Sequence, residues 1–259
     1  MTIHRHALPI TGSEVFATVA GRNYLVSYET TARSQADAAE ATGQTLWFDP
    51  GAFTIYRKLQ KALRARRESG EIITADEEHE LLHAPRDWRG YYEWLDPRLD
   101  RPTTLAIIPD VIDGASQFQD ALIKDWPHGK KGVPVFHIHH NHERMLRLLD
   151  EWDWVAFGSA GEYWEILSDA WEERMHFLWE EIAKRHSRTP QVHMLRGMQL
   201  CLKPNPFPFA SLDSSDVGQN HNRPQNTALD MVNRWDAAQC PARYTPRVHK
   251  QLSLLEIAA

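Results

Sequence analysis

Short apolar runs alternate along this chain with longer polar segments that have helical spacing, and this alternation is the feature that most constrains its fold. Parallel strands joined by crossover helices produce such a pattern. It predicts an α/β fold of the TIM-type (β/α)8 barrel class, as one domain over residues 1–259, with one more strand needed for closure. The seven runs are Tyr24–Tyr28, Thr45–Phe48, Thr104–Ile108, Val133–Ile138, Trp154–Phe157, Gln191–Leu195 and Phe209–Leu212.

Two of the intervening segments have a clear helical pattern. Apolar residues recur three and four positions apart over His142–Trp152 and Ser168–His186, and Asn141 and Ser168 are suitable N-caps for these helices. Two other segments, at about 76–102 and from about 220 onward, combine prolines or clustered aromatics with charges, and we expect them to be irregular.

Length and composition indicate what kind of protein the chain can form. With 259 residues and 42% hydrophobic content, the chain can bury a sizeable core. No apolar run reaches the length of a membrane helix and the first residues lack a signal-peptide pattern, so we expect a soluble, cytoplasmic protein without a membrane partner. Cys201 and Cys240 have no C-x-x-C spacing, which predicts neither a disulfide framework nor a cysteine-rich zinc site.

The formal net charge is −6, yet one segment is strongly basic. It contains Ile55, Leu59 and Leu63 at helical spacing, so the cations lie on a helix that is either simply solvated or a phosphate-binding surface. The candidate nucleic-acid-binding residues are Arg57, Lys58, Lys61, Arg64, Arg66 and Arg67.

Polar side chains gather just after the predicted strands. In a parallel barrel these strand ends meet at one mouth, where barrel enzymes hold their active sites. A single strand-end aspartate is often only a helix cap, but five polar strand ends together favour an active site. They are Asp49 to Phe53, Pro109-Asp110, His137 to His140, Gly158 to Gly161, and Asp213 to Asp216.

Two further interpretations stay open at this point. His137, His139 and His140 contain a His-x-His pair that is familiar as a zinc site, which would make the protein a metal-dependent barrel hydrolase acting on a small molecule. A nucleic-acid-binding or scaffold protein on a barrel without activity is the third, because fold alone never guarantees catalysis.

The order of the strand-end motifs resembles the tRNA-guanine transglycosylase superfamily, in particular its shorter phage-type branch that inserts 7-deazaguanine bases into DNA. The resemblance covers about two thirds of the chain, and Pro50 stands where the family has serine. The matching segments are Trp47 to Phe53, Ile108 to Ile112, Val133 to His137, Val155 to Glu162, His193 to Met198 and Ala210 to Ser215.

This resemblance implies a base exchange through a covalent aspartyl intermediate. Asp213 would be the nucleophile, and Asp49 would protonate the departing guanine and take a proton from the incoming base. Asp110 would bind the guanine edge, with the remaining base-binding positions at Phe53, His137, Gly158, Ser159 and Met194.

The resemblance also implies the partners. The family's three-cysteine and histidine zinc site is missing here, so we expect no metal or other cofactor, and DNA as the polymer with tRNA as the second candidate. The incoming base would be a 7-deazaguanine such as 7-cyano-7-deazaguanine, in a phage or prophage setting. A partner protein or a homodimer is compatible with the sequence.

Overall fold

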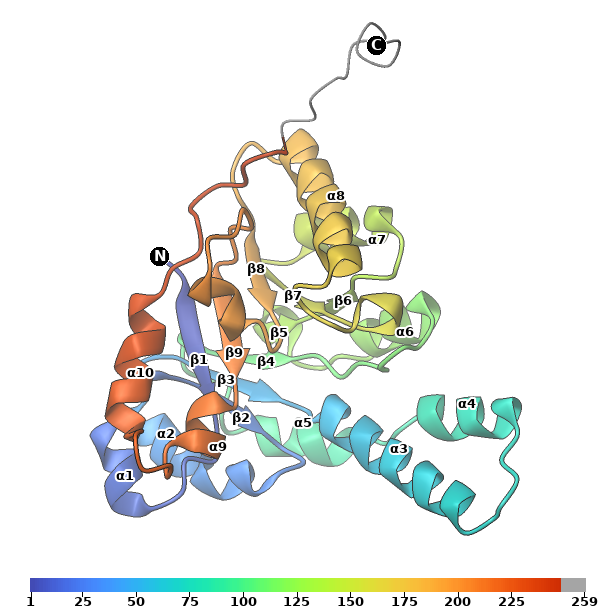
Figure 1. The fold of residues 1–259 in the computed structure, drawn as a ribbon, viewed down its shortest axis with the longest axis horizontal. Coiled ribbons are helices and arrows are strands. Elements are labelled where there is room, and N and C mark those ends of the chain that lie inside the picture. The colour runs from blue at the N-terminus through green and yellow to red at the C-terminus, as the bar shows by residue number, and fades with distance from the viewer. Residues whose placement is uncertain (248–259) are drawn as a thin grey trace, which may run out of the picture.

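The computed structural model describes residues 1–247, and this part of the chain forms an α/β fold around a nearly closed barrel of nine parallel strands. The strand order is β5-β4-β3-β2-β1-β9-β8-β7-β6 (Figure 1). The strands are β1 (Ile3–Ala7), β2 (Asn23–Ser27), β3 (Leu46–Asp49), β4 (Thr104–Ile107), β5 (Gly132–Val133), β6 (Val135–His137), β7 (Trp154–Gly158), β8 (Gln191–Met194) and β9 (Ser211–Ser214).

Strands β5 and β6 are two halves of one barrel position. Val133 pairs with Ile107 of β4, Val135 pairs with Ala156 of β7, and only Pro134 separates the two halves. Proline has no N–H to donate, but its carbonyl accepts a hydrogen bond from the Ala156 amide at 2.9 Å. The nine strands therefore occupy eight positions, as a TIM-type barrel requires.

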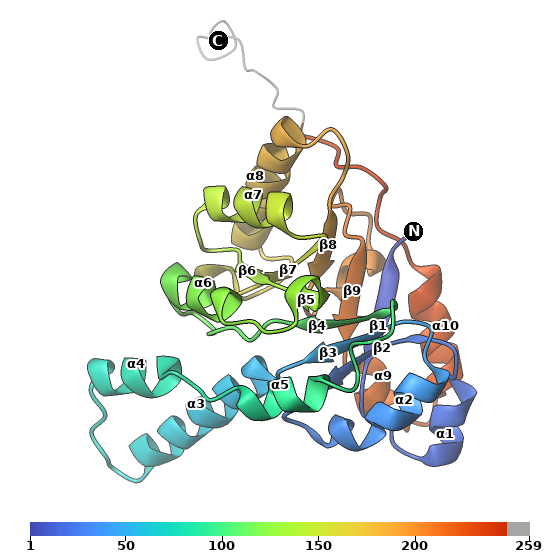
Figure 2. The same ribbon diagram turned by 180° about the vertical axis from the view of Figure 1, so that it is seen from behind.

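Helices surround the barrel, except between β8 and β9, where the connection holds only the short 3-10 turn η4 (Met198–Leu202). Helices α3 and α4 project away from the barrel as an arm (Figures 1 and 2). The helices are α1 (Ser13–Thr18), α2 (Ala36–Thr42), α3 (Ala52–Glu68), α4 (Ala75–His83), α5 (Arg89–Leu95), α6 (Ser116–Lys124), α7 (His142–Glu151), α8 (Asp169–Arg185), α9 (Asp216–Asn220) and α10 (Ala228–Ala237).

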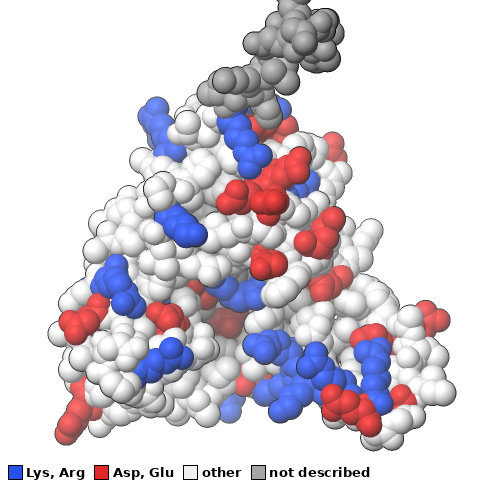
Figure 3. Space-filling model, viewed as in Figure 1, with Lys and Arg blue, Asp and Glu red and all other residues white. Residues whose placement is uncertain are grey.

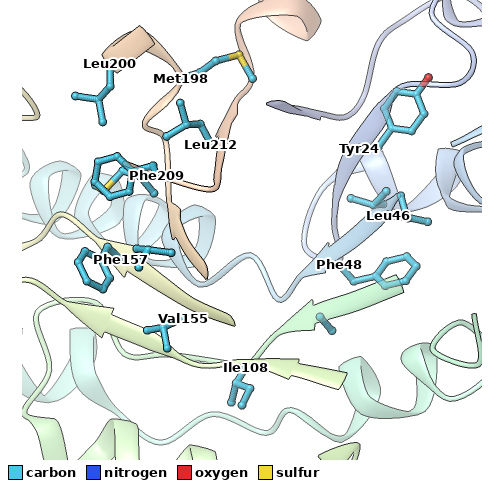
Figure 4. Close-up of a cluster of buried hydrophobic side chains, with 14 of the residues drawn as sticks. Tyr24, Leu46, Phe48, Ile108, Val155, Phe157, Met198, Leu200, Phe209 and Leu212 are labelled. Atoms are coloured by element: carbon cyan, nitrogen blue, oxygen red, sulfur yellow. The ribbon is translucent and has the colours of Figure 1, made fainter. Parts of the chain in front are cut away.

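Two apolar layers build the core, because successive residues of a strand point to opposite faces of the sheet. The larger layer fills the space between strands and helices, as around Phe157 and Phe209 in Figure 4. A smaller cluster fills the barrel interior and includes Leu25, Trp47 and Ile107. The rim of the barrel at the carboxyl ends of the strands is left to polar side chains.

The seven predicted strands are present within a residue or two of their expected limits, and the strand missing for closure is β1. Its sequence, Ile-His-Arg-His-Ala, has few apolar residues, so it lacks the hydrophobic pattern that predicts a strand. The partners of these polar side chains are distant in sequence. His4 Nε2 lies 2.7 Å from the Ala238 carbonyl, and His6 Nε2 lies 3.0 Å from Asp236 Oδ1 at the end of α10.

The two helices predicted from periodicity are confirmed as α7 and α8, and so are their caps. Asn141 Oδ1 accepts a hydrogen bond from the Glu143 amide at 3.0 Å, and Ser168 Oγ accepts one from the Trp171 amide at 3.3 Å. These bonds satisfy amides that a helix start leaves without a partner.

The prediction that residues 76–102 and the chain from 220 onward are irregular is wrong for much of both segments. Helices α4 and α5 lie in or at the edge of the first, and α10 lies in the second. Thr74 caps α4 at the Glu77 amide and Thr227 caps α10 at the Asp230 amide, each about three residues ahead. Each threonine lies within one turn of the helix start that it caps, so these helix starts could have been predicted from the sequence. The prolines and clustered charges of the two segments had indicated irregular structure instead. Residues 248–259 of the predicted tail lie outside the described part.

In the part of the chain that the structure describes, no helix is long and apolar enough to cross a membrane.

Candidate functional site at the barrel mouth

The predicted strand-end residues converge at the carboxyl end of the barrel. Asp49 ends β3, His137 ends β6, Gly158 ends β7, and Asp213 lies in β9. Asp110 follows β4 by three positions. Asp110, His137 and Asp213 are buried, whereas Asp49 is partly exposed at the mouth. Residues that span more than 160 positions of sequence thus share one site.

Asp213 is held by two hydrogen bonds to the same oxygen. The backbone amide of Arg196 donates to Asp213 Oδ1 at 2.7 Å, and His193 Nε2 lies 3.1 Å from that atom. His193 Nδ1 lies 2.7 Å from Ser211 Oγ. A carboxylate only accepts hydrogen bonds, so His193 Nε2 carries the ring proton and Nδ1 accepts from the Ser211 hydroxyl. Burial lowers the pKa of His193, which favours this neutral ring.

A buried arginine lies in the barrel interior at the level of Asp213. Arg5 pairs in register with Asp213, its guanidinium lies 3.9 Å from the Trp47 ring centroid, and its Nη1 donates to Thr45 Oγ1 at 2.8 Å. Burial lowers the pKa of Arg5 to about 9, while the charge of Asp213 acts in the opposite direction. Arg5 therefore remains a cation near neutral pH and balances the buried aspartate.

The pKa of the Asp49 carboxyl is raised. Burial raises its pKa from 3.8 to about 7, and the nearby negative charges of Asp110 and Asp213 act in the same direction. The Gly51 amide and the Ser27 hydroxyl act in the opposite direction and lower the pKa. A carboxyl with a pKa near 7 can both give and take a proton near neutral pH, which suits acid and base catalysis.

The turn after Asp49 requires glycine. Gly51 has a φ of 83°, and a Cβ on it would lie 2.5 Å from Glu29 Cβ. Only glycine enters this left-handed region without strain. The tight turn starts α3 immediately after the strand, and so places Phe53 at the rim of the mouth.

His137 is paired with Asp110. Its Nε2 lies 2.9 Å from Asp110 Oδ2, although the two atoms are not aligned for a hydrogen bond. A Cβ on Gly158 would lie 3.2 Å from His137 Nδ1, so Gly158 leaves the room that this ring occupies. His137 therefore lies against Asp110 at the mouth, a contact that the sequence did not indicate.

Met194 does not reach the mouth. His193 points into the barrel toward Asp213, so Met194, the next residue, points outward and is fully buried in the layer under the helices. Leu195 packs against the interior cluster instead. The predicted contact of Met194 with a base is therefore not supported by its position.

Arg196, two positions after Met194, reaches the mouth instead. It adopts a φ of 58°, which turns its side chain across the mouth. Its guanidinium lies 4.4 Å from the Phe53 ring centroid, and Nη2 donates to the Ser159 carbonyl at 3.1 Å. Ser159 Oγ in turn accepts from Trp171 Nε1 at 2.9 Å. Phe53, Ser159 and Arg196 thus form one side of the rim.

Asp113, which has a φ of 58°, ties the arm to this rim. Its Oδ2 accepts from the Tyr56 hydroxyl of α3 at 2.8 Å, and its Oδ1 accepts from the Gly161 amide at 2.6 Å. The start of α3 is therefore fixed relative to the loops that follow β4 and β7.

The three clustered histidines pack against one another. The rings of His139 and His140 lie 4.3 Å apart between centroids and nearly perpendicular, and His140 Nε2 bonds the Gly114 carbonyl at 3.0 Å. Burial lowers the pKa of His140 to about 4. Within residues 1–247 no group of three or more His, Cys, Asp or Glu side chains is arranged to hold a metal ion. The geometry gives the hydrolase interpretation no support.

The predicted basic helix is α3, and its cations divide into two sets. Arg66 forms ion pairs with Glu71 and Glu77, and Arg67 forms one with Glu78, so these two join α3 to α4 and the turn between them. The other four are exposed and make no ion pair with any described residue. Lys and Arg side chains gather over α3 in Figure 3. The four are Arg57, Lys58, Lys61 and Arg64.

The two cysteines are neighbours, which the spacing argument did not anticipate. Cys201 Sγ and Cys240 Sγ lie 3.2 Å apart as free thiols, although 39 positions separate them in sequence. The contact joins η4 to the segment after α10.

Three residues of the site were missed in the sequence: Arg5, His193 and Arg196. For His193 and Arg196 a signal was present, because both lie in the His193 to Met198 segment at the end of a predicted strand. For Arg5 the signal was weaker, since an arginine flanked by two histidines does not suggest a strand that faces a barrel interior.

Comparison of the chain with protein-family models, with curated proteins and with solved structures finds no match.

Proposed function

We propose that this protein is a base-exchange transglycosylase that replaces guanine in DNA with a 7-deazaguanine, such as 7-cyano-7-deazaguanine, with tRNA as the second candidate polymer. The observation that carries the proposal is the pair of carboxyls at the mouth, because they differ in environment as the two roles demand. Asp213 is fixed by His193 and the Arg196 amide, whereas Asp49 has a pKa of about 7.

Asp213 acts as the nucleophile. Its carboxylate attacks C1′ of the target nucleotide while the bond from C1′ to the guanine nitrogen breaks, which gives a glycosyl ester. Donors on one oxygen, Oδ1, hold the carboxyl in place and leave Oδ2 for the attack. The cation of Arg5 balances the charge of the aspartate inside the barrel before the reaction.

Asp49 moves the proton. As a carboxylic acid it protonates the departing guanine, and as a carboxylate it takes a proton from the incoming base, whose nitrogen then attacks C1′ and releases Asp213. One base leaves and one enters, so no oxidant, nucleotide triphosphate or other co-reactant is consumed.

Asp110 supplies specificity. A carboxylate accepts two hydrogen bonds from the N1–H and exocyclic amino group of guanine, which adenine cannot offer in that pattern, and a buried acceptor left without its donors rejects the wrong base strongly. The ring of His137 lies beside this carboxylate, with 2.9 Å between Nε2 and Oδ2. Phe53 and the Arg196 guanidinium that lies over its ring form the rim beside the bound base.

The target base must leave its stack to reach the mouth of a barrel. The exposed cations of α3 start next to Phe53 and extend along the arm, so they provide a surface for the phosphates of the same strand.

The test is incorporation of labelled 7-cyano-7-deazaguanine or labelled guanine into duplex DNA, single-stranded DNA and tRNA. We expect incorporation into DNA by the wild type, and its loss in Asp213→Asn and Asp49→Asn. The matched control is Asp153→Asn, which changes an exposed aspartate just before β7, far along the strand from the mouth. Incorporation that persists in Asp213→Asn would contradict the covalent mechanism.

A further inference from the structure

A groove lies beside the mouth and is not used by the reaction described above. It has a volume of about 320 Å³ and is lined by Trp164, Glu165, Ile166, Arg196 and Gln199. Its walls come from two connections, the one after β7 that includes η3 (Gly161–Tyr163) and the one after β8 that includes η4. Both connections leave the carboxyl ends of their strands, so the groove opens on the same end of the barrel as Asp213.

Trp164 gives the groove an exposed aromatic face. Its exposed fraction is 64%, against 37% for Phe53 at the rim. One exposed apolar residue is ordinary on a protein surface, but this one shares a groove with charged and amide side chains. A ring face beside hydrogen-bonding groups is the arrangement that binds flat, polar-edged ligands.

The charges of the groove select the kind of ligand. The groove has one cation, Arg196, whose guanidinium is engaged with the Phe53 ring and the Ser159 carbonyl. Its one carboxylate, Glu165, repels a phosphate but can accept hydrogen bonds from the amino group of a nucleobase. Gln199 offers both a donor and an acceptor to the edge of such a base. The groove therefore suits a neutral, planar base rather than the sugar-phosphate backbone.

Arg196 connects the groove to the rest of the site. Its backbone amide holds Asp213, and its guanidinium lies over Phe53, which opens α3. Arg196 thus contacts the groove, the nucleophile and the start of α3. A strand whose phosphates follow α3 and whose target base enters the mouth would place an adjoining base at the groove.

We propose that this groove binds the unpaired nucleobase next to the exchanged one, stacked on Trp164 with its edge toward Glu165 and Gln199. The proposal rests on the proposed function, because it places a neighbour of the base that the mouth receives. It makes the protein a reader of single-stranded or locally opened DNA, with sequence context sensed at one adjacent position.

The test measures binding rather than base exchange. The dissociation constant of a fluorescein-labelled single-stranded DNA oligonucleotide is measured by anisotropy over a series of salt concentrations. For Trp164→Ala we expect an affinity loss of roughly 5-fold to 150-fold, the usual effect of removing one base–aromatic stack. The slope of log Kd against log salt should stay as in the wild type, because no phosphate contact is lost.

Two further variants control the result. Trp164→Phe keeps an aromatic face and should retain most of the affinity. Phe177→Ala removes an aromatic side chain of α8 whose exposed fraction is 38%, and should bind as the wild type does.

Unchanged affinity in Trp164→Ala, a changed salt slope, or a wild type that binds no DNA would overturn the groove proposal. Its outcome is separable from that of the proposed function. If wild type incorporates no labelled base while Trp164→Ala loses binding, the groove stands and the exchange reaction fails. If label is incorporated and Trp164→Ala binds normally, the exchange reaction stands and the groove fails.

Discussion

The raised pKa of Asp49 should make the protein less stable as pH rises, and Asp49→Asn should remove this loss. An ionised Asp49 is disfavoured in the folded state by burial and by the charges of Asp110 and Asp213, but not in the unfolded chain. Because the folded-state pKa lies above the unfolded one, the folded protein binds a proton more tightly. The contribution of Asp49 to the unfolding free energy is then greatest at acidic pH, and it is lost as pH rises from the unfolded-state pKa through the folded-state pKa.

The magnitude follows from the two pKa values. A change of the Asp49 pKa from 3.8 to about 7 means that folding favours the protonated carboxyl over the ionised one by about 4 kcal/mol. Asp49 is partly exposed, and solvent screening reduces the figure, so we expect about 2 to 4 kcal/mol. The difference in unfolding free energy between Asp49→Asn and wild type should be small near pH 4, should grow toward pH 7 and should then stay constant.

The assay is urea unfolding of wild type, Asp49→Asn and Asp153→Asn at a series of pH values from 4 to 9. The exposed Asp153 controls for the loss of one negative charge. A hydrogen bond lost in Asp49→Asn would change its unfolding free energy by the same amount at every pH. The readout is therefore how the difference in unfolding free energy between Asp49→Asn and wild type varies with pH. A difference that stays flat across the series would refute the burial argument and would remove the main support for Asp49 as the proton-transfer group.

The remaining predictions concern Asp213 and the arm. His193→Leu removes a buried donor from Asp213, so it should lower the unfolding free energy by about 1–3 kcal/mol and also slow base incorporation; an unchanged incorporation rate in the folded variant would contradict the positioning role. Reversal of the four free cations of α3 to glutamate should weaken DNA binding and flatten its salt dependence. Arg66→Gln with Arg67→Gln should alter that slope much less, because both side chains are paired within the arm. Equal slopes for the two arm variants would contradict the division of the cations.

The sequence by itself determined the barrel class and most of its strands. Runs such as Trp154–Phe157 are apolar on both faces, because a barrel strand packs against helices outside and against other strands inside, and this double burial is visible in a single sequence. The same holds for the caps of α7 and α8, since a cap needs only residues within one turn. Asp49, Asp110 and Asp213 were found because strand ends carry them.

Only the tertiary structure decided what these residues face. Strand β1 is held through His4, Arg5 and His6, whose partners lie as far away as Asp236 and Ala238, so no local pattern reveals it. The alternation of β8 turned His193 inward and Met194 outward, since a shift of one position exchanges the two faces of a strand. Closure of the barrel also raised the pKa of Asp49, because burial and the charges of Asp110 and Asp213 act on it only once the chain is folded.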